Sequence, residues 1–448
     1  MLNAAHDKTY IINHSLLKRR HKRFLGDKMK NIISKLKARK ILDSRGNPTI
    51  EVEVGIAGGK PELIYGRAAA PSGASRGKSE VVDFPDGGVD AAIEKVEKLL
   101  PGLTGIDAFD QEKIDITLRE MDGTPNLAEI GGNTTVAISM AAAKAAAAAK
   151  GLPLFQYLGG ERAYELPCPL GNIIGGGKHA GRIAPDIQEI LVVAVGAKNF
   201  LDAFIANTKV HKKVRKLVGQ VDKTFTGGKG DEGAWAPNME NEVAIDLVKK
   251  ACEEIGGEVD FEIKPALDVA ASSFYNEEKD NYIYNRDSMT RDRGEQLDFI
   301  ASLIKKYDLF YVEDPIQEED FEGFAELTEK FGGDCLICGD DLFVTNVERI
   351  AKGIESKSAN AVLIKPNQIG TLTDTLRAVE LAKKNKYTPV MSHRSGETPD
   401  ETIAHLTVAW GCPMIKTGVV GGERIAKLNE LIRIEEGLSG RARMGRLR

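Results

Sequence analysis

Five apolar segments in the second half of the chain each end in a polar residue, and these polar residues recur at nearly even intervals. They are Glu313, Asp340, Lys365, His393 and Lys416, separated by 27, 25, 28 and 23 residues. Each interval has room for one strand, one helix and two short loops. Because the carboxyl ends of parallel strands meet at one edge, we expect the five side chains to gather at the mouth of a barrel.

Carboxylates in this series form a candidate metal site. Asp268 ends an earlier apolar run that starts near Ile263, so Asp268, Glu313 and Asp340 are expected to point at a common position. At an effective dielectric constant of about 20, each close pair of carboxylates costs about 4 kcal/mol, so the group requires a cation. Oxygen ligands favour Mg²⁺ over zinc. Each acid taken singly could instead be a helix cap or a turn residue, an alternative that the regular spacing weakens.

Composition excludes several classes of protein. The 448 residues, 42% of them hydrophobic, can bury a large core and indicate two domains. No apolar run approaches the roughly 18 residues of a membrane span, so we expect a soluble protein. The first 28 residues hold seven Lys or Arg and two Asp, a charge of +5, which leaves −10 for the rest of a chain whose net charge is −5. Such an acidic body argues against nucleic acid as a partner.

Five cysteines, an odd number, argue against a disulfide framework and favour a reducing, cytoplasmic location. Cys335 and Cys338 have the spacing of a redox pair. An offset of three residues inside a strand, however, places two side chains on opposite faces of the sheet. We therefore interpret both cysteines as structural.

Residues 1–36 are interpreted as a basic N-terminal extension that is disordered. Their basic segment, residues 16–24, lacks the apolar core of a signal peptide. Three interpretations stay open: a disordered arm, a weak targeting segment, and an upstream start codon in a gene whose translation begins at Met29. The first and the last are favoured.

Residues 37–165 are predicted to form an α+β capping domain. Apolar and polar residues alternate over residues 50–56, which indicates a half-buried strand that turns at residues 58–59 and returns through residues 63–65. The segment 68–77, rich in Gly, Ser and Ala, is predicted to be a mobile lid loop, with an ordinary connector as the alternative. Helical patterns follow at residues 90–100, 108–121 and 134–150.

Residues 166–448 are predicted to form a barrel of eight strands. Only residues 175–186 separate the first two strands, too few for a crossover helix, so this pair should be antiparallel. Two helical patterns then follow in succession, around residues 200–205 and 243–251, which predicts the order ββαα(βα)₆. The apolar segments are residues 166–174, 187–195, 263–269, 310–313, 335–339, 361–365, 388–392 and 413–416.

Two glycine-rich turns lie in the irregular first part of the barrel. In residues 227–233 an acidic pair that ends in Glu232 lies between glycines. The pattern is not that of a Walker loop. It is typical of a carboxylate presented on a tight turn. Residues 175–181 carry His179, and Glu189 follows on the next strand. A single histidine such as His179 is more often structural, and that alternative stays open.

Ten short motifs of this chain resemble the enolase family, the phosphopyruvate hydratases, and occur in the order of that family. The resemblance covers the chain from Lys37 to Leu438, and Pro366, Gly421 and Gly422 resemble an archaeal branch. The motifs are DSRGNPT from Asp43, PSGAS from Pro71, GGKHAG from Gly176, GDEG from Gly230, VEDP from Val312, DDLFVTN from Asp340, NQIGTLT from Asn367, SHRSGET from Ser392, IKTG from Ile415 and ERIAKLNELIRIEE from Glu423.

The resemblance implies a fold, a reaction and a set of partners. The implied fold is α/β, with an α+β capping domain before an enolase-type (β/α)₈ barrel. The implied reaction is the Mg²⁺-dependent, reversible dehydration of 2-phospho-D-glycerate to phosphoenolpyruvate, a lyase reaction of glycolysis and gluconeogenesis. The implied partners are this small phosphorylated substrate and further copies of the chain, in a homo-oligomer that is at least a dimer.

The resemblance also implies roles for single residues. Lys365 is the implied general base, and Glu232, supported by Glu189, is the implied general acid. The other implied catalytic residues are His179, His393 and Lys416. The implied substrate-binding residues are His179, Glu189, Arg394, Ser395, Lys416 and Ser75. The implied metal ligands are Asp268, Glu313 and Asp340 for one Mg²⁺, and Ser75 on the lid for a second Mg²⁺ recruited with the substrate.

Elementary chemistry supports these roles. Removing a proton next to a carboxylate adds negative charge to a group already ionised, and Mg²⁺ together with Lys416 would stabilise that charge. The same cations should lower the pKa of Lys365 and favour its neutral form. Hydroxide is a poor leaving group, and we expect neighbouring carboxylates to keep Glu232 protonated so that it can supply a proton.

Three positions depart from the family pattern. Arg76 stands where the family has Thr, Gly175 where it has Asn, and Arg182 where it has a small residue. Arg76 bears most directly on lid closure and on the second Mg²⁺. Two alternative functions therefore stay open: a catalytically impaired enolase paralogue that acts as a binding or scaffold protein, and another lyase of the enolase superfamily.

Removal of residues 1–28 should leave the fold and the activity unchanged, because the resemblance begins beyond Met29 and the extension lacks apolar periodicity. A chain that starts at Met29 tests this through its yield of folded enzyme and its turnover of 2-phosphoglycerate. Loss of the folded enzyme would contradict the prediction.

Overall fold

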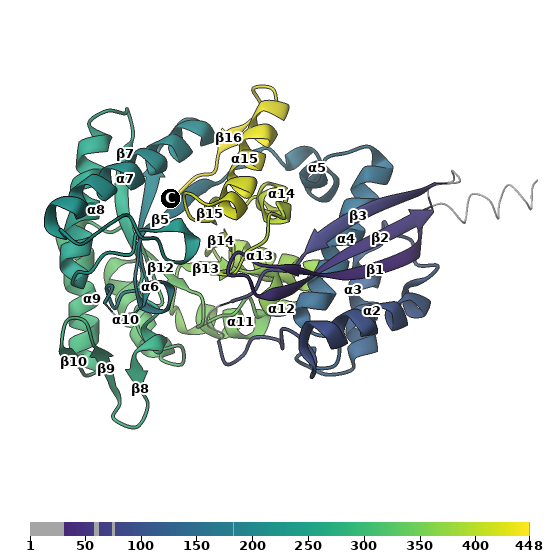
Figure 1. Cartoon of the computed structure of the whole chain (residues 1–448), viewed down its shortest axis with the longest axis horizontal. Helices are drawn as coiled ribbons and strands as arrows, with labels where there is room; N and C mark the ends of the chain where they lie inside the picture. The colour runs from purple at the N-terminus through teal and green to yellow at the C-terminus, as the bar shows by residue number, and fades with distance from the viewer. Residues whose placement is uncertain (1–30, 58–61, 74–76, 182, 448) are drawn as a thin grey trace, which may run out of the picture.

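The computed structural model describes residues 31–57, 62–73, 77–181 and 183–447. They form a three-stranded sheet with helices at one end of the molecule and a closed barrel at the other (Figure 1). Among these residues, no helix is long and apolar enough to cross a membrane. The predicted features that lie outside the described residues are Ser75, Arg76, Arg182, the turn at residues 58–59 and most of the N-terminal extension.

The N-terminal part is built on an antiparallel sheet in which β1 (Ile32–Leu42), β2 (Pro48–Ala57) and β3 (Leu63–Ala69) pair in sequence order. The alternating apolar residues of β2 are fully buried, as their pattern predicts. β1 begins at Ile32, so the boundary predicted at Lys37 falls inside this strand. Lysines and an arginine interrupt its apolar residues and obscure the strand in the sequence.

The three helices predicted for the N-terminal part are present as α2 (Gly88–Leu103), α3 (Gln111–Asp122) and α4 (Gly132–Lys150). α4 packs against β2 and β3, and seven of its nine alanines are buried. Small side chains allow a helix and a sheet to approach closely. α5 (Leu154–Gly159) then leads to the barrel.

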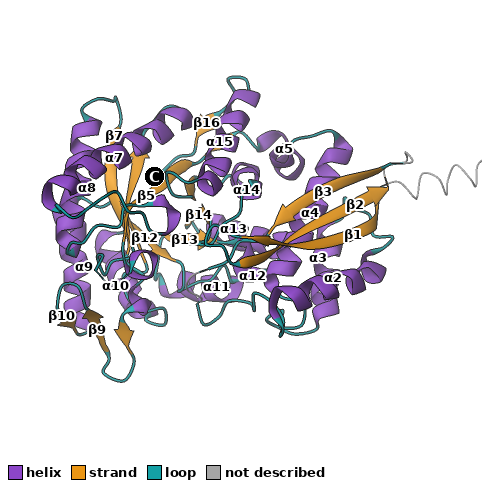
Figure 2. Cartoon of the chain, viewed as in Figure 1, coloured by secondary structure: helices purple, strands orange, loops and turns teal. Residues whose placement is uncertain are grey.

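Eight strands close the barrel, and they correspond to the eight predicted segments (Figure 2). The first two strands are antiparallel as predicted. The second strand is also antiparallel to the third, whereas all other neighbours in the barrel are parallel. The strands are β5 (Cys168–Gly175), β6 (Glu189–Val195), β7 (Glu262–Asp268), β11 (Tyr311–Glu313), β12 (Leu336–Gly339), β13 (Ala361–Ile364), β14 (Thr388–Ser392) and β15 (Met414–Lys416).

Helices surround the barrel in the predicted order. Two of them follow β6 in succession, and one long helix follows each later strand. The helices are α7 (Phe200–Val221), α8 (Asn241–Gly256), α9 (Arg293–Tyr307), α10 (Phe321–Phe331), α11 (Val347–Ser356), α13 (Leu372–Lys384), α14 (Thr402–Trp410) and α15 (Gly422–Gly437).

Shorter elements complete the chain. A small sheet between β7 and α9, formed by β8 (Tyr275–Asn276), β9 (Asn281–Tyr284) and β10 (Met289–Arg291), is not among the elements predicted from the sequence. The remaining short elements are α6 (Gly177–Ala180), α12 (Pro366–Ile369), β4 (Glu165–Leu166), β16 (Arg443–Met444) and the 3₁₀ turns η1 (Gly160–Arg162), η2 (Asp231–Gly233) and η3 (Ala271–Ser273).

Side chains fill the interior of the barrel. A buried cluster that includes Leu170, Leu191 and Met414 occupies it, so the barrel is a packed core rather than a pore. Cys338 belongs to this interior cluster, whereas Cys335 packs in the core outside it. The two thiols thus lie on opposite faces of the sheet, as predicted, and all five cysteines are free and buried.

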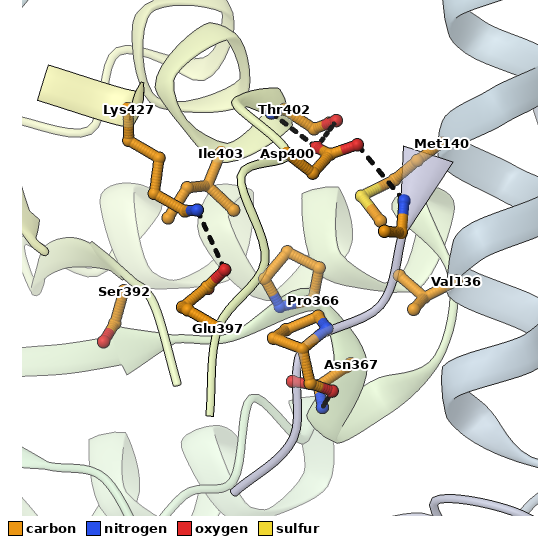
Figure 3. Close-up of a pocket in the computed structure, with 12 residues that line it drawn as sticks. Val136, Met140, Pro366, Asn367, Ser392, Glu397, Asp400, Thr402, Ile403 and Lys427 are labelled. Carbon is orange, nitrogen blue, oxygen red and sulfur yellow. Dashed lines mark hydrogen bonds and ion pairs between the residues drawn. The ribbon is translucent and has the colours of Figure 1, made fainter. Parts of the chain in front are cut away.

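The N-terminal part reaches the mouth of the barrel at the loop that follows β14. Ser72 and Gly396 exchange two backbone hydrogen bonds of 2.7 and 2.8 Å, and the backbone N–H of Ser44 donates to the carbonyl of Glu397 at 2.7 Å. A small cavity lies nearby, between α4 and the barrel (Figure 3). Its apolar lining includes Val136, Met140, Pro366 and Ile403.

Replacing Gly66 of β3 by alanine should destabilise the protein. A Cβ atom at this position would lie 2.0 Å from the carbonyl oxygen of Ala141 and 2.2 Å from the amide nitrogen of Ala145, both in α4. Helix and sheet would have to separate, at a cost of about 1–3 kcal/mol in the free energy of unfolding.

Thermal unfolding of Gly66→Ala measures this effect, with Gly256→Ala as the control because no atom lies within 4 Å of a Cβ there. Equal unfolding temperatures for the two variants would show that the close approach of β3 and α4 contributes no stability.

Candidate active site

Residues from six strands meet at the mouth of the barrel. Asp268 and Glu313 lie opposite each other in the register of β7 and β11. The mouth opens into a small cavity lined almost entirely by polar side chains. The residues that end or directly follow a strand here are Asp268, Glu313, Asp340, Lys365, His393 and Lys416. The structure therefore brings together the series that the sequence spacing singled out.

The ammonium group of Lys416 lies among three carboxylates. Its Nζ is 2.9 Å from Asp268 Oδ2, 2.9 Å from each carboxylate oxygen of Glu313 and 3.3 Å from Glu189 Oε1. Burial alone would lower the pKa of Lys416. The surrounding carboxylates outweigh burial and hold this pKa well above its ordinary value, so Lys416 is a fixed cation at the centre of the site.

The surroundings of Lys416 fit a further cation. Burial raises the pKa of Glu313 to about 8, the charge of Asp268 adds to this rise, and Lys416 opposes it. Gln188 donates its Nε2 to Asp268 Oδ2 at 3.3 Å, while its buried Oε1 makes no hydrogen bond among the described residues. Buried oxygen atoms that lack sufficient positive charge are the donor set that a hard divalent cation such as Mg²⁺ prefers.

Asp340 binds Lys365 rather than Lys416. Its Oδ2 accepts a hydrogen bond from Lys365 Nζ. Burial lowers the pKa of Lys365, but the charges of Asp340 and Glu313 together outweigh burial, so this pKa lies above its ordinary value. Arg394 and Lys416 lower the pKa of Lys365, as expected from the sequence, and the contact with Asp340 opposes them. The effect of Mg²⁺ on this pKa stays a prediction.

Two further side chains hold Asp340 in place. Gln368 donates Nε2 to Asp340 Oδ1 at 3.0 Å. Asp314 accepts hydrogen bonds from the backbone N–H groups of Asp340, at 2.9 Å, and of Asp341, at 2.8 Å. Among the described residues, the ligand atoms of Asp314, Asp340 and Asp341 lie within 4.8 Å of one another, whereas the expected trio of Asp268, Glu313 and Asp340 does not form such a close group.

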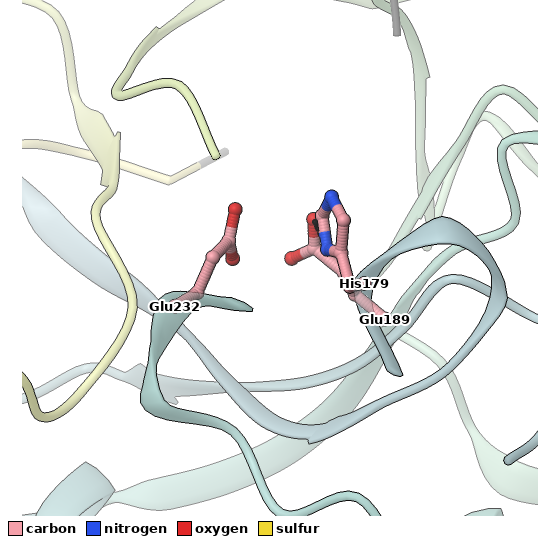
Figure 4. Close-up of side chains that lie close together, drawn as sticks. All are labelled: His179, Glu189 and Glu232. Carbon is pink, nitrogen blue, oxygen red and sulfur yellow. Dashed lines mark ion pairs between the residues drawn. The ribbon is translucent and has the colours of Figure 1, made fainter. Parts of the chain in front are cut away.

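A second group of titratable side chains lies beside Lys416. His179, on α6, has its Nδ1 3.6 Å from Glu189 Oε1. Glu232 projects toward this pair from η2, as Figure 4 shows, and the ligand atoms of the three residues lie within 4.8 Å of one another. The backbone of Glu232 is left-handed, with a φ of 64°, as expected of a residue on a tight turn.

Both carboxylate oxygens of Glu232 have polar neighbours. His393 Nε2 lies 3.1 Å from Oε1, and Asn172 donates its Nδ2 to Oε2 at 3.1 Å. Burial raises the pKa of Glu232, but His393, His179 and Arg424 outweigh burial. The pKa of Glu232 is therefore held well below its ordinary value.

Glu189 shows the opposite shift. Burial, and after it the charge of Glu232, raise the pKa of Glu189 well above its ordinary value against the attraction of Lys416. Glu189 Oε2 is buried and makes no hydrogen bond among the described residues. The sequence predicts a protonated Glu232, but the surroundings favour the proton of this acid pair on Glu189, because burial and the charge of Glu232 raise the pKa of Glu189, whereas His393, His179 and Arg424 lower that of Glu232.

Arg394 and Ser395 line the mouth next to the N-terminal part. The guanidinium of Arg394 binds both carboxylate oxygens of Glu80, at 3.0 and 3.2 Å, and donates to Asn367 Oδ1 at 3.1 Å. Burial lowers the pKa of Arg394, and Glu80 and Asp340 raise it above its ordinary value. Ser75, expected on the lid, lies outside the described residues, so its contact with the site stays a prediction.

Several polar residues at the mouth are absent from the set predicted from the sequence. Asp314, Asp341, Gln368 and Ser392 lie inside the short motifs quoted above, so the complete motifs point to all four. Glu80, Asn172 and Gln188 carry no such local signal. The residues include Glu80, Asn172, Gln188, Asp314, Asp341, Gln368 and Ser392.

Comparison with known proteins identifies the family. The family model for the enolase N-terminal domain matches residues 33–158 of this chain. The family model for the enolase C-terminal TIM barrel domain matches residues 163–446. The chain is 58% identical over 411 residues to an enolase of Methanosphaera stadtmanae, across 92% of this chain and 98% of the relative.

Two other archaeal relatives give the same result. An enolase of Methanothermobacter thermautotrophicus is 56% identical, across 91% of this chain and 97% of the relative. An enolase of Pyrobaculum aerophilum is 48% identical, across 92% of this chain and 98% of the relative. With both of its parts matched and its full barrel aligned, the chain belongs to the enolase family, the lyases known as phosphopyruvate hydratases.

Proposed function

We propose that this chain dehydrates 2-phospho-D-glycerate reversibly to phosphoenolpyruvate, with Lys365 as the general base and Glu232 as the general acid. One observation carries the proposal: Lys365, Glu232 and the carboxylate-bound Lys416 all line a single polar cavity. The first two come from different parts of the barrel, after β13 and on η2. A substrate between them can lose a proton to Lys365 while Glu232 gives a proton to the departing hydroxide, which leaves as water.

Proton removal by Lys365 requires its neutral form. Arg394 and Lys416 both lower the pKa of Lys365, and Asp340 raises it. Any interaction that draws the charge of Asp340 away from Lys365 therefore lowers the pKa of Lys365 and favours its neutral form. The buried Lys416 then stabilises the charge that accumulates on the substrate carboxylate, because a cation at a fixed position in a water-poor site needs no reorganisation.

Departure of hydroxide requires a proton from the opposite side of the cavity. Glu232 and Glu189 form a coupled pair in which the environment favours a proton on Glu189 and a charge on Glu232. We assign the donation to Glu232, with Glu189 and His179 as the neighbours that deliver its proton. His393 and Asn172 orient the carboxyl group through their contacts with its two oxygens.

Asp268, Glu313 and Asp340 are the residues that would hold one Mg²⁺, and Ser75 is proposed to meet a second one recruited with the substrate. When bound, Mg²⁺ supplies positive charge next to the substrate carboxylate. Arg394 and Ser395 would bind the substrate phosphate, since a guanidinium offers a fork of donors that matches phosphate oxygens. Arg394 would then exchange Glu80 for the substrate.

Several coarser features of the family complete the proposal. We infer a division into a capping domain, residues 37–165 together with the first part of β1, and a catalytic barrel, residues 166–448. We also infer a homo-oligomer of at least two copies and a cytoplasmic location, in line with five free, buried cysteines. Light scattering of the purified protein measures its molar mass and so tests whether it forms an oligomer.

Lys365→Ala and Glu232→Gln should fail at different steps of the reaction. Lys365→Ala should abolish both phosphoenolpyruvate formation and exchange of the substrate α-hydrogen with D₂O. Glu232→Gln should lose turnover by roughly 10²–10⁴-fold, as expected of a missing general acid, and still exchange that hydrogen. Proton NMR of 2-phosphoglycerate in D₂O with each variant and Mg²⁺ measures the exchange directly.

Lys384→Ala and Glu380→Gln, which alter exposed residues of α13, serve as matched controls that should keep both activities. If Lys365→Ala still exchanges the hydrogen while Glu232→Gln does not, the two assigned roles are reversed.

Asp314→Asn should weaken Mg²⁺ binding by about 10–100-fold, the usual cost of losing a residue that orients a metal ligand. Asparagine tolerates the left-handed backbone of this position, φ 41°, but can no longer accept the hydrogen bonds of both Asp340 and Asp341. Calorimetric titration with Mg²⁺ measures the affinity. Asp298→Asn, on the exposed face of α9, is the charge-matched control, and equal Mg²⁺ affinities of the two variants would refute the orienting role.

A further inference from the structure

We propose that Arg424 is a positioning residue for this reaction, one that fixes the proton of His393 on Nε2 and thereby keeps an N–H group beside Glu232. The proposal rests on the function proposed above for Glu232. It concerns a residue that touches neither substrate nor metal ligands in the proposed scheme, and that acts only through the groups it holds.

Arg424 lies in the first turn of α15 and is completely buried. Its Nη1 lies 2.7 Å from His393 Nδ1 and 2.6 Å from the carbonyl oxygen of Arg394, and its Nη2 lies 2.6 Å from the carbonyl oxygen of Ser395. The guanidinium thus binds three consecutive residues of the loop after β14. These are the residues proposed to contact the acid and the phosphate.

The chemistry of the guanidinium determines the state of the imidazole. Arginine carries donors only and stays protonated in proteins, so a ring nitrogen beside it must accept. His393 Nδ1 therefore presents its lone pair to Arg424, and the single proton of the neutral ring lies on Nε2. Nε2 lies 3.1 Å from Glu232 Oε1, and it makes no aligned hydrogen bond among the described residues.

The charges around His393 favour this neutral tautomer. Burial lowers the pKa of His393 to about 3, Arg424 and Lys416 oppose a second proton, and Glu232 alone favours one. A second proton would also have to lie on Nδ1, directly against the guanidinium. The imidazole therefore presents a fixed N–H group beside one oxygen of Glu232 and cannot accept its proton.

A second buried cation on the same helix provides the comparison. Lys427 lies one turn after Arg424 and is also almost completely buried. Its Nζ lies 2.8 Å from Glu397 Oε2, a contact visible in Figure 3, and donates to the carbonyl of Thr398 at 2.8 Å. Lys427 thus holds the same loop, but none of its contacts involves His393. A residue that only stabilises the loop should behave like Lys427.

Nitrogen NMR of the wild-type enzyme, labelled with ¹⁵N at histidine, tests the tautomer without any change to Arg424. The chain has seven histidines, and the loss of one set of signals in His393→Gln assigns His393. We expect a protonated Nε2 and an unprotonated Nδ1 near neutral pH, with Mg²⁺ present. A proton on Nδ1, or an averaged mixture of the two tautomers, would overturn the proposal.

Variants then test the consequence for catalysis. Arg424→Gln should shift the His393 signals and lower turnover by roughly 10–100-fold, the range typical of residues that orient a reacting group. Exchange of the substrate α-hydrogen with D₂O should stay near the wild-type rate, because that step belongs to Lys365.

Arg424→Lys should recover part of the turnover, since an ammonium group also only donates. Lys427→Gln should lower the unfolding temperature and leave the His393 signals and the ratio of exchange to turnover unchanged.

Arg424→Gln with wild-type His393 signals, or with exchange and turnover reduced equally, would show that Arg424 only supports the loop. If Arg424→Gln does not fold, the wild-type spectrum and Arg424→Lys decide the question. Failure of the proposed function gives a different result: Glu232→Gln would itself lose the exchange, while the tautomer of His393 would still be measurable.

Discussion

Negative charge at the mouth of the barrel is fixed there by the strands themselves. Asp268 and Glu313 end two strands that are hydrogen-bonded in register, so their carboxylates cannot separate without breaking the barrel. The buried ammonium of Lys416 neutralises part of this charge, and Lys365 does the same for Asp340. Removing one member would leave another charge buried and unpaired, which is far more costly than the net contribution of the pair. The charged residues at the mouth of the barrel therefore depend on one another.

The loop after β14 depends on partners from both ends of the chain. Ser72 of the N-terminal part pairs with Gly396, while Arg424 and Lys427 of α15 bind the carbonyl oxygens of residues 394, 395 and 398. Glu80 of the N-terminal part holds Arg394. Separate segments thus fix the backbone that presents the groups proposed to bind phosphate, and the capping domain contributes to the site as well as covering it.

The sequence predicted the barrel better than it predicted the state of the site. Long apolar runs with regular spacing locate eight strands, because burial on both faces leaves a continuous signal. β1 and the β8–β10 sheet were not predicted, since charged residues interrupt the first and the strands of the second are very short. The charge of Glu232 could not be predicted, because it depends on Asn172, His393 and Arg424, which come from three distant segments.

The reversal of β6 has a consequence for where new chemistry can arise on this barrel. β6 is antiparallel to its neighbours, so it begins at the mouth of the barrel rather than ending there. Glu189 is its first residue, and the connection between β5 and β6 carries His179 beside it. β6 therefore ends at the end of the barrel opposite the mouth. α7 runs back toward the mouth and α8 runs away from it, which brings the loop between these two helices, and with it Glu232, to the mouth. One inverted strand thus creates a hairpin and an interhelical loop at the mouth. The loops that carry the proposed acid can therefore change there without disturbing the regular βα units that carry Lys365, the proposed base.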